Sequence, residues 1–154
     1  MNAFKITFED ILPLWKTELW PNRESAIEPM SVMTWPYEGD PDEYDMSIME
    51  KFQPTFVGVE IDGKLVGVNS GHRTSDRHYR SRGIWVSPAY RELGIAQTLF
   101  NLTELQAITE GCEMLWSIPR ETALSSYTRF GFETVGGFIE TETSVSNVYV
   151  RKFL

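Results

Sequence analysis

The chain is poor in cysteine, in basic residues and in long hydrophobic runs. One cysteine, Cys112, among 154 residues excludes a disulfide framework and is typical of a reducing compartment. Acidic residues outnumber basic ones by 22 to 14, which argues against binding to nucleic acid or to an anionic membrane. No apolar run reaches the roughly 18 residues of a membrane span, and no basic-then-apolar leader opens the sequence. We therefore expect a cytoplasmic protein whose partners include neither nucleic acid nor a membrane.

Apolar residues, by contrast, are plentiful. They make up 42% of the chain, so a packed core is expected rather than disorder. At this length one domain buries about two thirds of the surface of its unfolded chain. The sequence contains no internal repeat and no low-complexity segment. We expect a single domain over residues 1–154.

The clearest local pattern is the alternation of apolar residues on both sides of Asp62-Gly63. It predicts a β-hairpin with a two-residue turn that places Val59 opposite Val66. Other patterns predict strands over 4–8, 79–88, 113–118, 132–138 and 147–154, and helices over 9–20, 94–110 and 121–130. Prolines break the pattern between 21 and 54 and leave at most short helices over 23–33 and 45–52. The predicted fold class is α/β (α+β), with a mostly antiparallel first half.

The predicted helix over 94–110 has one apolar face and begins with small residues. The apolar face comprises Ile95, Leu99, Leu102 and Leu105. At the start, Gly94 and Ala96 would let an anion approach main-chain amides that lack intrahelical partners, and Arg91 would add positive charge. The same residues also fit a helix that packs closely on a neighbouring strand.

Two longer segments narrow this choice. The segment IWVSPAYRELGIAQTLF resembles motif A of the GNAT superfamily of acyl-CoA-dependent N-acyltransferases, through Val86, Pro88, Tyr90, Arg91, Gly94 and Ala96. About thirty residues later, ALSSYTRFGF resembles motif B of the same superfamily, through Ala123, Tyr127, Gly131 and Phe132. With the order of the predicted elements, the resemblance covers nearly the whole chain.

The resemblance implies a mixed, splayed central sheet flanked by helices. It implies an N-acetyltransferase in which a primary amine (a small amine, an amino acid or a peptide amine) directly attacks acetyl-CoA, the co-substrate. Main-chain amides between Arg91 and Gln97 would bind the pyrophosphate, Trp85 and Val86 would pair with the pantetheine arm, and Tyr127 would be the general acid. The cofactor-binding residues expected in this way are Trp85, Val86, Arg91, Glu92, Leu93, Gly94, Ile95, Ala96 and Gln97. No metal is expected. The alternatives are a non-catalytic sensor or interaction module that binds acyl-CoA, and a purely structural domain.

The sequence departs from the family where a general base is expected. Positions that hold histidines in some relatives hold Arg80 and Arg82, which do not accept protons at pH 7. Arg120 stands where many relatives have an asparagine. The remaining candidates for the base are His72, Glu60 and an ordered water.

The sequence also leaves the chemical class of the acceptor undecided. The acidic stretch EGDPDEYD would attract a cationic amine, but it also fits a solvated turn; its acids are Glu38, Asp40, Asp42, Glu43 and Asp45. The stretch is a poor match to a calcium loop. Arg23, Arg80 and Arg82 could instead hold a carboxylate, which would favour an amino acid. A homodimer also stays open.

Overall fold

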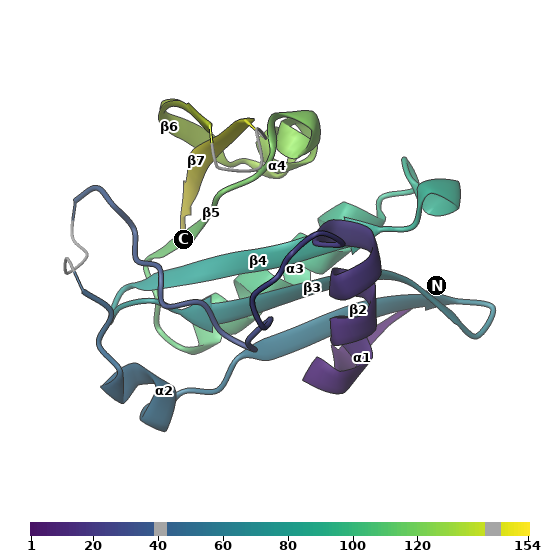
Figure 1. Ribbon diagram of the computed structural model, residues 1–154, viewed down its shortest axis with the longest axis horizontal. Helices are drawn as coiled ribbons and strands as arrows, with labels where there is room; N and C mark the ends of the chain where they lie inside the picture. The colour runs from purple at the N-terminus through teal and green to yellow at the C-terminus, as the bar shows by residue number, and fades with distance from the viewer. Residues whose placement is uncertain (39–42, 141–145) are drawn as a thin grey trace.

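One mixed sheet of seven strands organises the protein (Figure 1). The structure is a computed structural model that describes residues 1–38, 43–140 and 146–154. Along the sheet the strand order is β1-β2-β3-β4-β5-β7-β6, and only β4 and β5 run parallel. The strands are β1 (Asn2–Ile6), β2 (Thr55–Ile61), β3 (Lys64–Arg73), β4 (His78–Val86), β5 (Met114–Ser117), β6 (Glu133–Glu140) and β7 (Ser146–Phe153). The predicted α+β class is confirmed.

Helices cover both faces of the sheet. The longest, α3 (Ile95–Thr109), packs on β2, β3 and β4 from one side. On the other side lie α1 (Phe8–Leu14) and the π-helical turn η1 (Trp15–Leu19), seen in front of the sheet in Figure 1. The remaining helices are α2 (Ser47–Lys51), η2 (Pro88–Tyr90), η3 (Glu121–Ala123) and α4 (Leu124–Phe130).

The segment 23–33, where at most a short helix was expected, forms none. Two of its main-chain groups bond to side chains of the sheet. The Ser31 amide donates to Nε2 of His72, and the Glu28 carbonyl accepts from Nη1 of Arg82. A segment whose polar main-chain groups are satisfied in this way has no need of helical hydrogen bonds.

The hairpin forms as expected, but its register differs by one residue. Asp62 and Gly63 both have positive φ, 50° and 77°, as a type I′ turn requires. A bulge follows, so Val59 lies opposite Gly67 and not opposite Val66. Val59 and Val66 are nevertheless both fully buried in the cluster beneath α3, because the bulge keeps their side chains on one face.

The buried face of α3 is also more polar than its pattern predicts. Leu105 is 59% exposed, whereas Thr103 is buried. The Thr103 hydroxyl donates to the Leu99 carbonyl and accepts from Nδ2 of Asn69, both at 2.9 Å, and Nδ2 of Asn69 also donates to Oγ of Ser81 at 2.9 Å. This network joins α3 to β3 and β4, and an apolar pattern cannot reveal it.

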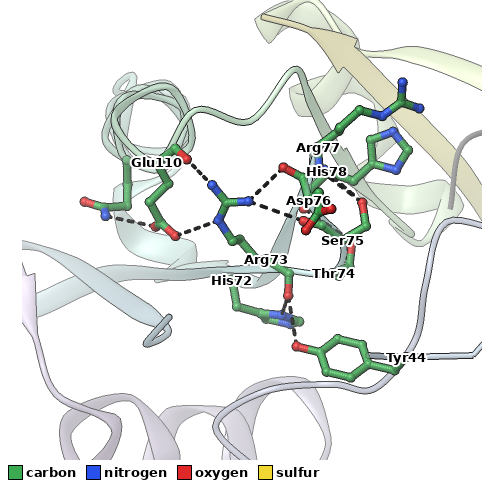
Figure 2. Close-up of polar contacts among 10 residues, drawn as sticks. Tyr44, His72, Arg73, Thr74, Ser75, Asp76, Arg77, His78 and Glu110 are labelled. Atoms are coloured by element: carbon green, nitrogen blue, oxygen red, sulfur yellow. Dashed lines mark hydrogen bonds and ion pairs between the residues drawn. The ribbon is translucent and has the colours of Figure 1, made fainter. Parts of the chain in front are cut away.

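An arginine ties the turn between β3 and β4 to the end of α3 (Figure 2). Arg73 bonds Oε1 of Glu110 at 3.3 Å and also donates to the main-chain carbonyl of Glu110. Its Nη1 donates to the Asp76 carbonyl at 2.8 Å, and its guanidinium lies 4.0 Å from the ring centre of Phe52. A cation at the carboxyl end of a helix is favourably placed. The contacts fix the start of β4 relative to α3.

Candidate active site

The two parallel strands separate after three paired residues. Pairing joins His78–Arg80 to Met114–Trp116, after which β4 continues to Val86 while β5 ends at Ser117. In Figure 1, β5, β7 and β6 swing away from β4 beyond this point. The result is a gap in the middle of the sheet, bordered on one side by the second half of β4.

A bulge shapes the edge of β4 that borders this gap. Gly83 has φ 78°, and the register shift around it gives β4 one residue more than β3. The Gly83 carbonyl accepts a 2.8 Å hydrogen bond from Nε1 of Trp15, and a Cβ at Gly83 would overlap the indole ring. Trp15 therefore holds the bulge in one conformation, and only glycine fits there.

The loop after β4 leaves the first amides of α3 without a side-chain cap. Gly94 is the N-cap residue, with φ 81°, and the space where its Cβ would lie is open. Glu92 also has positive φ, and Nε of Arg91 donates to the Val86 carbonyl at 3.1 Å. A 15-residue helix with uncapped amides and an open approach can bind an anion at its amino end.

The other residues expected to bind the cofactor lie along the same path. Trp85 and Val86 end β4, so the path runs from the gap to the start of α3. The Ile95 side chain is buried beneath the helix, which leaves only its main chain for a ligand. Nε2 of Gln97 donates to the Ser126 carbonyl at 3.1 Å and so connects α3 to α4. Cofactor binding by these residues stays a prediction.

Tyr127 lies on α4 and is only 4% exposed. Its ring packs against Phe100 and Phe132, with ring centres 4.8 and 5.3 Å away. Burial raises the pKa of the phenol, while a hydrogen bond with Ser117 and the charge of Arg80 lower it. The phenol is therefore protonated at neutral pH, and it stands where β4 and β5 begin to separate.

His72 does not have the environment of a general base. It is fully buried, its Nε2 accepts from the Ser31 amide at 3.3 Å, and its Nδ1 lies 3.0 Å from the Arg73 carbonyl (Figure 2). Burial lowers the pKa of His72 to about 3, and the charges of Arg80 and Arg82 act in the same direction. With both nitrogens engaged, the neutral ring positions the segment around Ser31.

Glu60 is placed no better than His72 to act as a general base. It lies on β2 opposite Leu65, next to the hairpin turn, and two strands from β4. The positions of His72 and Glu60 argue against both as the general base, and the third candidate is an ordered water.

The acidic stretch and two of the arginines make local contacts. Asp40 and Asp42 lie outside the described residues, and Glu38 and Glu43 are exposed. Asp45 accepts from the Ser47 amide at 3.0 Å, at the start of α2. Arg23 bonds Ser25 and Ala26, and Arg120 donates to the Leu19 carbonyl at 2.7 Å.

The model of the acetyltransferase (GNAT) family matches residues 15–132. The chain belongs to this family. GNAT membership makes the protein an acyltransferase.

Solved structures of GNAT proteins share the fold over most or nearly all of the chain. An aminoglycoside 6'-N-acetyltransferase complexed with coenzyme A is 12% identical, with a TM-score of 0.69 over 99% of this chain and 97% of that one. Ard1 from Thermoplasma volcanium is 12% identical, with a TM-score of 0.68 over the same shares. A GNAT family acetyltransferase from Elizabethkingia anophelis with acetyl-CoA bound is 12% identical, with a TM-score of 0.57 over 71% of this chain and 84% of that one.

Two features are absent from residues 1–38, 43–140 and 146–154. None of the helices there has the length and apolar character needed to cross a membrane. Nor do three or more His, Cys, Asp or Glu side chains gather in these ranges as metal ligands would.

Sequence reasoning missed two parts of the GNAT site. Ser117 donates to the Ser81 carbonyl and lowers the pKa of Tyr127, and nothing in its local sequence indicates this. The bulge at Gly83 did carry a signal, because a glycine inside a strand pattern often marks one. Its partner Trp15 is 68 residues away and could not be assigned from the pattern.

Proposed function

We propose that the protein is an N-acetyltransferase that moves the acetyl group of acetyl-CoA to a primary amine by direct attack. The observation that carries the proposal is the position of Tyr127, buried and protonated at neutral pH beside the gap between β4 and β5. The uncapped start of α3 at the outer end of the same gap supports it.

Acetyl-CoA would bind along β4 and the loop that follows it. The pyrophosphate would accept hydrogen bonds from main-chain amides between Arg91 and Gln97, because these amides lack partners within α3. The pantetheine arm would lie beside Trp85 and Val86, on the edge of β4 that faces the gap. The gap would then hold the thioester.

The transfer needs a neutral amine, a donor to the oxyanion and an acid for the leaving thiolate. The amine nitrogen bonds to the thioester carbon and forms a tetrahedral oxyanion. As the carbon–sulfur bond breaks, the thiolate takes the proton of Tyr127, and the proton that the attacking nitrogen loses as the amide forms returns to the phenolate through water. An amine of pKa about 10.4 must first lose its own proton, at a cost of about 4 kcal/mol at pH 7.

A non-catalytic acyl-CoA sensor with the same fold is the second candidate. The observation that favours it is the engagement of both ring nitrogens of His72, which removes the histidine considered as a general base. A sensor would bind acetyl-CoA without transferring the acetyl group.

Two measurements test these candidates. Calorimetry with acetyl-CoA tests binding, and we expect acetyl-CoA to raise the melting temperature because only the folded state binds it. Release of CoA thiol with a panel of amines then separates an enzyme from a sensor. Binding without release for every amine would favour the sensor, and no binding at all would overturn both candidates.

A further inference from the structure

Arg80 lies at the closed end of the gap, on the face of the sheet opposite to α3. It is the last residue of β4 that pairs with β5, where Trp116 is its partner. Its neighbour on β3 is His72, whose ring accepts from Ser31 in the segment that crosses this face. The guanidinium lies 5.2 Å from the ring centre of Trp116.

Among residues 1–38, 43–140 and 146–154, no carboxylate forms an ion pair with the guanidinium of Arg80. Its Nε and Nη1 atoms are buried and have no hydrogen-bond partner in the described part of the chain. The ionisable groups that act on it in favour of its charge are phenols, those of Tyr127 and Tyr149. Burial lowers the pKa of Arg80 to about 10, so it still carries a full charge at pH 7. A buried charge without a partner is costly, and a bound anion would remove that cost.

A second buried guanidinium follows two residues later. Nη1 of Arg82 donates to the Glu28 carbonyl, and its guanidinium lies 5.0 Å from the ring centre of Trp15. The charge of Arg80 lowers the pKa of Arg82, while the Glu28 carboxylate partly opposes this. The two like charges therefore repel each other, and an anion near Arg80 would relieve both.

The surroundings of Arg80 would make such an anion bind strongly. Trp35, Trp116 and Tyr149 form an aromatic cluster around it, with ring centres of Trp35 and Trp116 at 5.7 Å and of Trp116 and Tyr149 at 6.0 Å. Both tryptophans are buried. Hydrogen bonds to a charged group are stronger where water is excluded.

We infer that Arg80 binds a carboxylate of the acceptor, and that the acceptor is an amino acid. The amine would then reach the thioester in the gap while the carboxylate reaches the unpartnered Nε and Nη1 of Arg80 at its closed end. The inference rests on the proposed function, and it selects an anionic acceptor over the cationic amine that the acidic stretch would attract.

Matched acceptors test the inference without any substitution. The probes are the common L-amino acids as free acids and as their amides, which keep the amine and lose the carboxylate. We expect the acids to be acetylated with a KM roughly 10- to 100-fold lower than the amides, as for the loss of one charged hydrogen bond. Putrescine and spermidine serve as the cationic comparison and should be poorer still.

Variants assign the effect to Arg80. Arg80→Gln should raise KM for the acids roughly 10- to 100-fold and leave the amides unchanged, and Arg80→Lys should recover part of the loss. Arg77→Gln is the control, because Arg77 is half-exposed and its ion pair with Glu113 is long, at 3.8 Å. An unchanged melting shift with acetyl-CoA checks that each variant is folded.

The outcomes separate the inference from the proposed function. Equal or better use of the amides, or an equal loss of kcat for acids and amides in Arg80→Gln, would overturn the inference and leave the acetyltransferase standing. The second of these results would mean that Arg80 acts on the reacting thioester. No transfer to any amine, with acetyl-CoA still bound, would overturn both.

Discussion

The hydroxyl of Ser117 donates a 2.7 Å hydrogen bond to the carbonyl of Ser81, one residue beyond the last paired residues of β4 and β5. Ser117 also lies near Tyr127 and lowers the pKa of its phenol. One hydroxyl thus links the point at which the strands separate to the proposed acid. The width of the gap and the position of the phenol are expected to vary together.

Replacing Ser117 with alanine should therefore affect both stability and chemistry. Loss of the bond to Ser81 should lower the free energy of unfolding by about 1 kcal/mol. A less well positioned Tyr127 should lower kcat by roughly tenfold. Urea unfolding and steady-state kinetics measure the two effects, and Ser125→Ala, an exposed site on α4, is the control. A parental kcat in Ser117→Ala would mean that packing alone positions Tyr127.

Tyr127→Phe keeps the ring and its contacts with Phe100 and Phe132 but removes the proton near the leaving sulfur. We expect kcat to fall by about 10²- to 10⁴-fold, with little change in the affinity for acetyl-CoA. Tyr44→Phe is the control, since it also loses a hydroxyl bond, to the Arg73 carbonyl, away from the gap. A Tyr127→Phe enzyme within a few-fold of the parent would show that water protonates the thiolate.

The pH profile gives an independent test of Tyr127. Burial raises its pKa above the usual 10.0, so the protonated form persists to higher pH than it would in water. The activity of the parent should fall only above about pH 10, and this decrease should be absent in Tyr127→Phe. A decrease at the same pH in both proteins would assign it to another group or to unfolding.

Gly94 and Gly111 offer a matched pair at the two ends of α3. Both have φ 81°, and the space where a Cβ would lie is open at each. Valine at either position should strain the main chain to a similar extent, by about 1–2 kcal/mol. Only Gly94→Val should weaken acetyl-CoA binding, by at least about tenfold, because its side chain would stand in the approach to the helix amides. Calorimetry measures the affinity of both variants for acetyl-CoA, and equal affinities would contradict an anion site at the start of α3.

His72 should make the protein less stable as the pH falls. Its pKa is 6.5 in the unfolded chain and about 3 when folded, so between these values only the unfolded state gains the proton. Stability should decrease by about 1.4 kcal/mol per pH unit below 6.5 from this residue alone. His72→Gln should be less stable than the parent at pH 7, and the difference should shrink by pH 5. Parallel stability curves from urea unfolding would contradict the buried, neutral ring.

The sequence predicted the features that local chemistry decides. Asp62 and Gly63 specify a turn by their own main-chain preferences, and Gly94 and Gly111 mark the two ends of α3 in the same way. The GNAT motifs could be recognised for a related reason, since each lies within one stretch of chain.

What the sequence did not predict depends on partners that are far apart along the chain. Thr103 is buried because Asn69 bonds it, and the segment around Ser31 is not helical because His72 bonds its amide. The bulge at Gly83 depends on Trp15 in the same way. Each case requires the tertiary structure, because a polar group's preference for the surface changes once a partner satisfies it.

The groups proposed to act on the two substrates lie on opposite faces of the sheet, and this bears on the order of events in a catalytic cycle. Tyr127 and the start of α3 lie on one face, whereas Arg80 lies on the other. On the proposed function, acetyl-CoA and the acceptor would approach the gap from opposite faces of the sheet. Both substrates can then be bound at the same time. Initial rates at varied concentrations of both substrates should then give intersecting rather than parallel lines in double-reciprocal plots. CoA should compete with acetyl-CoA but not with the acceptor.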